Sequence, residues 1–199
     1  MAVLTRHLQY PFTLDQVRSL RAGQFVSVSG LVFTARDRAH KYLFDGGKCP
    51  ADLKDGAVYH CGPVMLRKEG AWVVCAAGPT TSTREEQYLP RIVKDCGVRV
   101  IIGKGGLGRP TEALCKQNGC VYLHAVGGAA QILAAKVVAV KGVHFLREFG
   151  LTEAMWELEL KDFPAIVAVD AQGRNLLRNV QVGSRRVLAH LLGDDPFMP

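Results

Sequence analysis

The sequence of 199 residues lacks the cysteine spacings that mark most metal sites. Its six cysteines stand at positions 49, 61, 75, 96, 115 and 120, and none of them forms a C-x-x-C pair or a zinc-site pattern. We therefore expect this chain to bind no metal or cofactor by itself. In a cytoplasmic protein, which is the default here, we expect all six thiols to be reduced.

The sequence also lacks a hydrophobic run long enough to cross a bilayer, and no secretory signal is apparent in its first residues. It has no block of lysine and arginine and no aromatic residues interleaved with basic ones, although the formal net charge is +7. We expect a cytoplasmic protein with no membrane and no nucleic-acid partner. The positive charge suits an anionic partner such as phosphate or a small polyacid.

The composition and the order of the segments predict one α/β domain over residues 1–199. Hydrophobic residues make up 48% and charged residues 22% of the chain, with no linker or compositional break. Residues 72–136 repeat strand, turn and helix three times, which favours parallel pairing with right-handed crossovers. The apolar run 98–102 is typical of a strand covered on both faces. We predict a mixed, partly parallel sheet with flanking helices, preceded by a small N-terminal β-rich portion.

The segment 78–84, Gly-Pro-Thr-Thr-Ser-Thr-Arg, follows an apolar run that predicts a buried strand over 72–77. Pro79 should end that strand. Thr83 and Glu86 have capping-box spacing, which predicts a helical turn that opens at Arg84. Hydroxyls, backbone N–H groups and a guanidinium would then gather at the carboxyl end of a strand, where α/β sheets usually bind ligands. A capped turn without a ligand explains the same spacing equally well.

Two further segments carry cations near predicted turns. Helical spacing places Arg36, His40 and Lys41 on one face, which is either a carboxylate clamp or a solvated helix face. In residues 103–110, glycines would let backbone N–H groups approach an anion closely, and Lys104 would add a point charge. This segment is neither a Walker A motif nor a full dinucleotide fingerprint, so a flexible turn is an equal alternative.

Four motifs occur together and in one order: Thr34-Ala35-Arg36-Asp37-x-Ala39-His40-Lys41, Gly78-Pro79-Thr80-Thr81-Ser82-x-Arg84, Gly103-Lys104-Gly105-Gly106 and Glu153-Ala154-Met155-Trp156. With them, nearly the whole chain resembles the β-subunit, or C-terminal domain, of class I iron–sulfur hydro-lyases. These are the two-subunit fumarases and the L-tartrate dehydratases. Glu85 departs from the pattern, because the family usually has an apolar residue, often methionine, after the arginine.

The resemblance implies a hetero-oligomer with divided roles. A partner α-subunit would carry a 4Fe-4S cluster on three cysteines, and its open iron would bind the leaving hydroxyl of a small dicarboxylate substrate. In this chain, Thr80 is implied as the catalytic base that takes the proton beside a carboxylate. Arg36, Arg84 and Lys104 are implied as carboxylate-binding groups.

The implied reaction is the reversible hydration of fumarate to L-malate, with conversion of L-tartrate to oxaloacetate as the second choice. Removing the proton from a dicarboxylate creates an aci-carboxylate trianion, which three cations would stabilise more than the ground state. Threonine is a poor base, so it would need nearby cations that favour its alkoxide, or a relay to another group. A non-catalytic anion-binding module that uses the same glycine turns is the alternative from another class.

Overall fold

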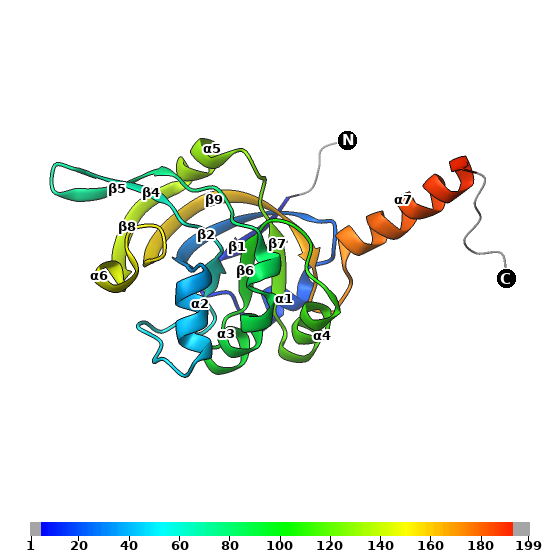
Figure 1. Cartoon of the computed structure of the whole chain (residues 1–199), viewed down its shortest axis with the longest axis horizontal. Helices are drawn as coiled ribbons and strands as arrows, with labels where there is room; N and C mark the ends of the chain where they lie inside the picture. Colours follow the sequence, from blue (N-terminus) through cyan, green and yellow to red (C-terminus); the bar gives the residue numbers. More distant parts are fainter. Residues whose placement is uncertain (1–4, 193–199) are drawn as a thin grey trace.

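The structure is a computed structural model, and it describes residues 5–192 (Figure 1). The sequence Asp194-Asp195-Pro196 predicts a loose tail, and these positions lie outside the described residues. The elements follow one another as β1 (Arg6–Gln9), α1 (Leu14–Ser19), β2 (Phe25–Thr34), α2 (Asp37–Phe44), β3 (Ala57–Tyr59), β4 (Val64–Lys68), β5 (Ala71–Ala76), the 3₁₀ turns η1 (Ser82–Arg84) and η2 (Glu86–Tyr88), α3 (Leu89–Asp95), β6 (Val100–Gly103), α4 (Arg109–Asn118), β7 (Val121–His124), α5 (Ala130–Ala134), β8 (Val137–His144), α6 (Leu146–Phe149), β9 (Met155–Val169) and α7 (Leu176–Leu192).

Seven strands form a mixed sheet in the order β1-β2-β3-β6-β7-β9-β8, and β9 also pairs with β2, so the sheet closes on itself. Strands β1, β2, β3, β6 and β7 run parallel to their neighbours among these five. The long strand β9 is antiparallel to β2, β7 and β8. The predicted α/β class, mixed sheet and N-terminal strands are confirmed, and the N-terminal strands belong to this same sheet.

The bend in β2 depends on one glycine. The sequence predicts a strand over 24–33 that is broken near Gly30, because glycine weakens a strand. Pairing between β2 and β9 indeed shifts register between Val28 and Gly30. Gly30 has a φ of +106°, and a Cβ atom there would lie 2.4 Å from the Cβ of Tyr10. A larger residue would therefore meet both a steric clash and an unfavourable backbone conformation.

Strand β6 shows why the sheet is covered on both sides. Its successive side chains point to opposite faces. Val100 and Ile102 pack in the cluster that contains Trp156, while Ile101 packs in a second cluster with Leu43 and other residues of the helices. In Figure 1, helices α2, α3 and α4 lie on one side of the sheet, and α5 lies with the β4–β5 hairpin on the other. The prediction of a doubly covered strand is confirmed.

Strands β4 and β5 form a separate two-stranded antiparallel sheet. The predicted parallel repeat is therefore wrong in its first unit, since the strand that begins near Trp72 does not join the main sheet. Only one face of the hairpin packs: Trp72 and Val74 contact the core, whereas Val73 is 42% exposed. The sequence Lys68-Glu69-Gly70 predicts a hairpin turn before Trp72. That turn is present, with positive φ at Glu69 and Gly70.

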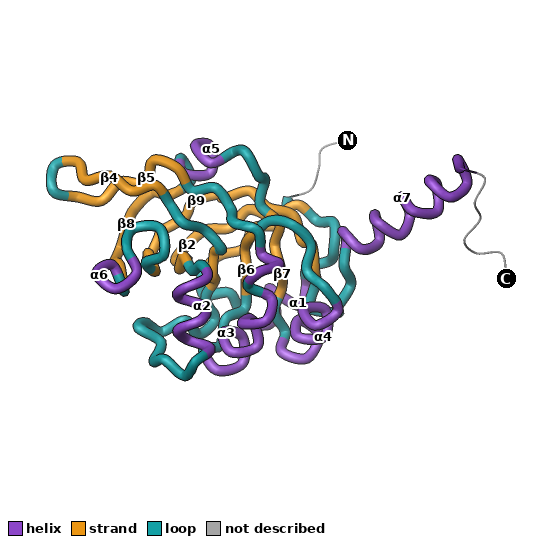
Figure 2. Tube along the Cα trace, viewed as in Figure 1, coloured by secondary structure: helices purple, strands orange, loops and turns teal. Residues whose placement is uncertain are grey.

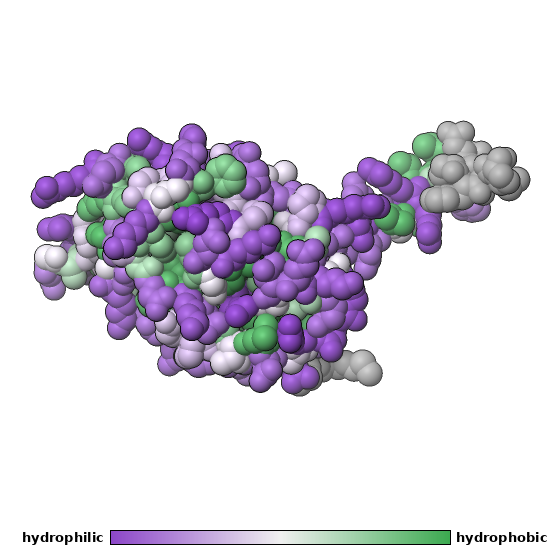
Figure 3. Space-filling model, turned by 90° about the horizontal axis from the view of Figure 1, so that it is seen from below, coloured by the Kyte–Doolittle hydropathy of each residue, from purple (hydrophilic) through white to green (hydrophobic). Residues whose placement is uncertain are grey.

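Helix α7 projects from the body of the protein, as Figures 1 and 2 show. The sequence predicts a terminal helix over 187–192, whereas α7 already begins at Leu176. Several of its apolar side chains are exposed, including Val187, Leu188 and Leu191. Hydrophobic residues are also visible along it and at the opposite, hairpin end of the molecule in Figure 3. Exposed apolar surface of this kind is typical of proteins that associate. Among residues 5–192, none of the helices has the length and hydropathy needed to cross a bilayer.

Candidate functional site

The residues that the sequence singles out lie around one edge of the sheet. Because β2, β3, β6 and β7 are parallel, their carboxyl ends meet at this edge. Strand β2 ends at Thr34 and is followed by Arg36, while β6 ends at Gly103 and is followed directly by Lys104. Thr80 reaches the same edge from the loop after the β4–β5 hairpin.

Residues 79–82, which we call the insert, lie between the ends of β3 and β6. The backbone N–H of Thr80 donates to the carbonyl of His60 at 2.6 Å. On the other side, the N–H of Lys104 donates to the carbonyl of Thr80 at 3.3 Å, and the N–H of Ser82 donates to the carbonyl of Lys104 at 3.0 Å. The insert therefore acts as an extra short strand that places Thr80 beside Lys104.

One acidic residue, Asp37, contacts both predicted arginines, and a second, Glu153, contacts Arg36. The guanidinium of Arg84 donates to Asp37 through Nε at 3.2 Å and through Nη2 at 3.1 Å. Arg36 lies with its Nε 3.3 Å from Glu153 Oε1 and its Nη2 3.9 Å from Asp37 Oδ2. The side chain of Arg36 is 26% exposed and that of Arg84 is 53% exposed. The two guanidinium groups thus share one carboxylate on an open surface.

Lys104 is half-buried and reaches this edge along the loop after β7. A Cβ atom at Gly127 would lie 3.5 Å from Lys104 Cδ, so the aliphatic part of the lysine passes over that glycine. Gly105, with a φ of +80°, makes the turn that follows. The structure therefore brings Thr80 and Lys104 together through the backbone, and Arg36 and Arg84 together through Asp37.

A buried polar layer lies under the insert. The Nδ1 atom of His60 and the Oγ atom of Ser82 are 2.9 Å apart. The hydroxyl of Tyr122 donates to the carbonyl of Gly105 at 2.9 Å and lies 3.2 Å from Ser82 Oγ. Burial lowers the pKa of His60 well below its usual value, so this imidazole is neutral at physiological pH. The sequence analysis did not identify the buried layer formed by Ser82, His60 and Tyr122. The run of hydroxyl residues after Pro79 and the histidine after an apolar strand are the sequence features that could have indicated it.

The predicted cationic face of α2 is wrong except for Arg36. His40 is buried, its ring lies 4.9 Å from that of His60, and burial lowers its pKa to about 3. Lys41 is exposed and pairs with Asp45 at 2.7 Å. Helical spacing predicted that these residues share one face of a helix. His40 instead faces the core, where a charged imidazole is unfavourable.

Glu85, the departure from the family pattern, is buried beside this network. Burial raises the pKa of its carboxyl to about 8, and the nearby negative charge of Asp37 adds to the effect. The side chain is therefore mostly protonated at pH 7. A neutral Glu85 leaves Asp37 as the carboxylate that pairs with Arg84.

The predicted capping box at Thr83 and Glu86 is also wrong. Thr83 Oγ1 donates to the carbonyl of Gly106 at 3.1 Å. Glu86 Oε1 accepts from the N–H of Gly108 and from Thr111 Oγ1, both at 2.7 Å. Glu86 thus lies at the N-terminus of α4, where negative charge is favourable, and links the insert region to the loop after β6.

The described residues offer no grouped set of side chains that could hold a metal ion. In the part of the chain that the structure describes, no three His, Cys, Asp or Glu side chains are grouped so that they could hold a metal ion. A 4Fe-4S cluster needs several thiolates close together, and the six unpaired cysteines do not provide such a set. The residues of this chain therefore do not fit that cofactor.

A family model described as "Fumarase C-terminus" matches residues 3–180. The chain belongs to the fumarase C-terminus family. This confirms the family that the four motifs suggest. The match includes all the residues of the insert and both arginines of the shared-carboxylate pair.

Three relatives of this fumarase C-terminus chain carry two kinds of name. A Geobacillus stearothermophilus protein named "Putative fumarate hydratase class I" is 49% identical over 183 residues, which are 92% of this chain and 35% of that protein. A Methanocaldococcus jannaschii protein named "Putative L(+)-tartrate dehydratase subunit beta" is 37% identical, over 94% of this chain and 100% of its own length. The "L(+)-tartrate dehydratase subunit beta" of Escherichia coli strain K12 is 31% identical, over 85% of each chain. The chain thus spans about a third of the first relative and the whole of the second.

Proposed function

We propose that this chain is the β-type half of a two-part hydro-lyase that acts on a small dicarboxylate. The observation that carries the proposal is the joint placement of Thr80, Lys104, Arg36 and Arg84 at one edge of the sheet. Relatives named as tartrate dehydratase β-subunits and as a fumarate hydratase support the reaction class.

The cations would bind the carboxylates of the substrate. A guanidinium has five N–H donors, and the bonds to Asp37 use two of those on Arg84, so further donors remain for a carboxylate. Arginine suits this role because its planar fork matches a carboxylate. Lys104 would add a point charge next to Thr80. Since Asp37 and Glu153 offset the two arginines, Lys104 would supply much of the net positive charge at the site.

Thr80 would take the proton from the carbon beside a carboxylate. A threonine hydroxyl is a weak base, and the positive charge of Lys104 would favour its deprotonated form. As the proton leaves, negative charge grows on the substrate carboxylate, and the same cations would stabilise it more in the transition state than in the bound substrate. This chain would therefore bind and orient the dicarboxylate substrate and take a proton from it.

The second half of the enzyme would be a cluster-bearing α-subunit. The donor set of this chain does not fit a 4Fe-4S cluster, so we assign the cluster to the partner and derive no step through it here. The printed β-subunit names of two relatives support an assembly of unlike chains. The open surface around Arg36 and Arg84 would be covered on assembly.

The test is co-expression with the α-subunit candidate encoded in the same genome, followed by assays on L-malate, fumarate and L-tartrate in parallel. We expect a brown complex that contains iron and labile sulfide and turns over a dicarboxylate, with fumarate and malate as our first choice and L-tartrate as the second. Turnover by the complex but not by either chain alone would support the divided site.

A colourless protein that binds phosphate and associates with no iron-containing partner would contradict the proposal. That result would support the alternative, an anion-binding module without catalysis. Phosphate binding can be measured by calorimetry on the isolated chain. The Thr80→Ala variant separates the two functions, because it would abolish turnover but leave simple anion binding intact.

A further inference from the structure

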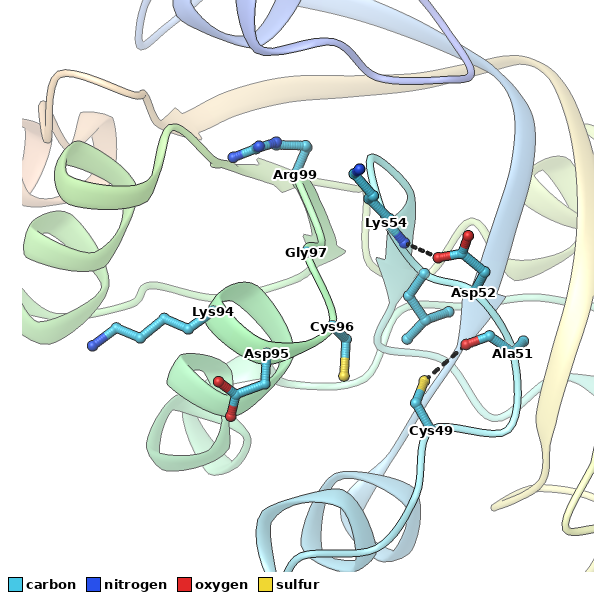
Figure 4. A pocket seen from close by; sticks show the side chains of 10 residues that line it. Cys49, Ala51, Asp52, Lys54, Lys94, Asp95, Cys96, Gly97 and Arg99 are labelled. Carbon is cyan, nitrogen blue, oxygen red and sulfur yellow. Dashed lines mark hydrogen bonds between the residues drawn. The ribbon is translucent and has the colours of Figure 1, made fainter.

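A polar pocket is lined by none of the residues that the proposed function uses. It occupies about 440 Å³ between the segment that follows α2 and the end of α3. Figure 4 shows that Cys49 comes from the first segment and Cys96 from the second, and that their sulfur atoms face one another. Lys54, Lys94 and Arg99 also line the pocket. The proposed hydro-lyase activity uses none of these residues.

Both thiols line the same pocket and both are half-buried. The neighbouring Cys96 thiol is the largest cause that lowers the pKa of Cys49 to about 6. The Cys49 thiol in turn is the largest cause that raises the pKa of Cys96. When protonated, Cys49 donates to the carbonyl of Ala51 at 3.1 Å, which fixes its side chain toward the pocket.

Charged groups from several elements face the pair. The charge of Arg91 on α3 favours the thiolate of Cys96, and Asp95 opposes it. Asp52 opposes the thiolate of Cys49, and His144 of β8 would favour it when protonated. The Asp95 carboxylate is itself paired with Arg91 at 2.5 Å. A solvent-accessible sulfur with thiolate character and a second thiol next to it is the arrangement that oxidants modify selectively.

We propose that Cys49 and Cys96 are a peroxide-reactive dithiol that closes to an intramolecular disulfide. The Cys49 thiolate attacks one oxygen of a hydroperoxide, the O–O bond breaks, and the other oxygen leaves as hydroxide, which gives a sulfenic acid on Cys49. The Cys96 thiol then forms the S–S bond, the S–O bond breaks, and its proton leaves with the hydroxyl as water. Two thiols lose two electrons and two protons, and hydrogen peroxide is reduced to two water molecules.

The chain contains a matched comparison. The sulfur atoms of Cys115 and Cys120 are 3.5 Å apart, but both residues are buried and burial contributes to a raised pKa of Cys115. Proximity alone would make this pair oxidise as fast as the first. Exposure and thiolate character would make Cys49 and Cys96 faster. Cys75, which is half-buried and comes from β5, serves as a lone-thiol control.

The experiment treats the full chain with hydrogen peroxide at pH 7, blocks the remaining thiols and maps the cysteines by mass spectrometry. We expect a disulfide between the peptides of Cys49 and Cys96, while Cys75, Cys115 and Cys120 remain alkylatable. In Cys96→Ser, dimedone should trap a sulfenic acid on Cys49. Cys49 should react at least about five times faster than Cys75. In urea, this preference should disappear, because it depends on the folded surroundings.

Equal oxidation rates at Cys49 and Cys75 in the folded chain would overturn the proposal. So would independent oxidation of Cys49 and Cys96 with no bridge between them, or faster bridging of Cys115 and Cys120. If a serine variant fails to fold, the wild-type map still decides, since it needs no substitution. The readout is independent of catalysis, so this proposal and the proposed function can fail separately.

Discussion

The carboxylate of Asp37 accepts both Nε and Nη2 of Arg84, at 3.2 and 3.1 Å. Asp37 opens α2 and Arg84 ends the turn η1, so this contact joins two motifs that are 47 positions apart in the chain. Both side chains are largely exposed, and such pairs contribute little to stability in water. The contact therefore matters more for the orientation of Arg84 than for the fold.

Replacing Asp37 with asparagine should weaken substrate binding. Arg84 would lose its charged acceptor and sample more rotamers, so we expect KM to rise about three- to ten-fold while kcat stays within about two-fold. Steady-state kinetics of the reconstituted complex measures both constants. Asp45→Asn, which removes an exposed partner of Lys41, is the control. An unchanged KM in Asp37→Asn would show that the carboxylate does not position the arginine.

Thr80→Ala should abolish most turnover without harming the fold. The insert is held by backbone hydrogen bonds that do not need the hydroxyl, so the melting temperature should stay within about 2 °C. Loss of a positioned base should lower kcat about 10²- to 10⁴-fold. Thr81→Ala, an exposed neighbour in the same insert, should keep its activity. Full turnover in Thr80→Ala would remove this residue from the base role.

Lys104→Met should impair both carboxylate binding and turnover, because the lysine is expected to stabilise the transition state more than the bound substrate. Losing a charged hydrogen-bond donor typically costs about 1.5–3 kcal/mol, which predicts a fall in kcat/KM of about ten- to a hundred-fold. Arg36→Met should act in the same direction. Lys68→Met, on the exposed face of β4, provides the matched control. If Lys104→Met and Lys68→Met have the same kinetics, Lys104 has only a surface role.

Ser82→Ala should destabilise the protein. The change removes the Ser82 hydroxyl from Nδ1 of His60 and from the hydroxyl of Tyr122, which still donates to Gly105. It should cost about 1–3 kcal/mol in the free energy of unfolding. Urea titration followed by circular dichroism measures this value. Ser19→Ala, whose hydroxyl is exposed at the end of α1, should cost far less. Equal losses in the two variants would contradict the idea of a structural polar layer.

Glu85→Gln should change how stability depends on pH. The pKa of Glu85 is raised from 4.5 to about 8, so between these values the folded chain binds more protons than the unfolded chain. Stability contributed by the protonated group is therefore lost as pH rises from about 4.5 to 8. Glutamine cannot ionise, so the variant should gain melting temperature relative to the native chain at pH 8 and above. The gain should shrink toward pH 5, and the exposed Glu148→Gln should show none of it; a pH-independent difference at Glu85 would refute the shifted ionisation.

Local patterns in the sequence predict the elements better than their partners. The run around Ile101 predicted a strand covered on both faces, because β-branched residues without polar alternation fit that setting. Gly30 predicted an interruption of its strand. The run after Trp72 looked similar, yet it forms a half-exposed hairpin, since pairing depends on distant residues that periodicity does not report. The spacing of Thr83 and Glu86 likewise suited a local helix cap. In the structure the Glu86 carboxylate instead accepts a hydrogen bond from the N–H of Gly108, at the start of the distant helix α4.

For the site too, the sequence predicts which residues take part better than it predicts which side chains meet. Four motifs in register named Thr80, Arg36, Arg84 and Lys104, and the fold brings their segments to one edge. Neither the shared carboxylate of Asp37 nor the neutral state of His40 could be read from spacing, because both depend on which side chains meet and on how much water reaches them.

The insert is anchored by main-chain groups, which every residue except proline possesses in full. The side chains of Thr80 and Thr81 can therefore be exchanged while the polypeptide path stays the same, whereas Ser82 also contacts His60 in the buried layer. The chemistry of this edge can thus change at two positions without any change of architecture.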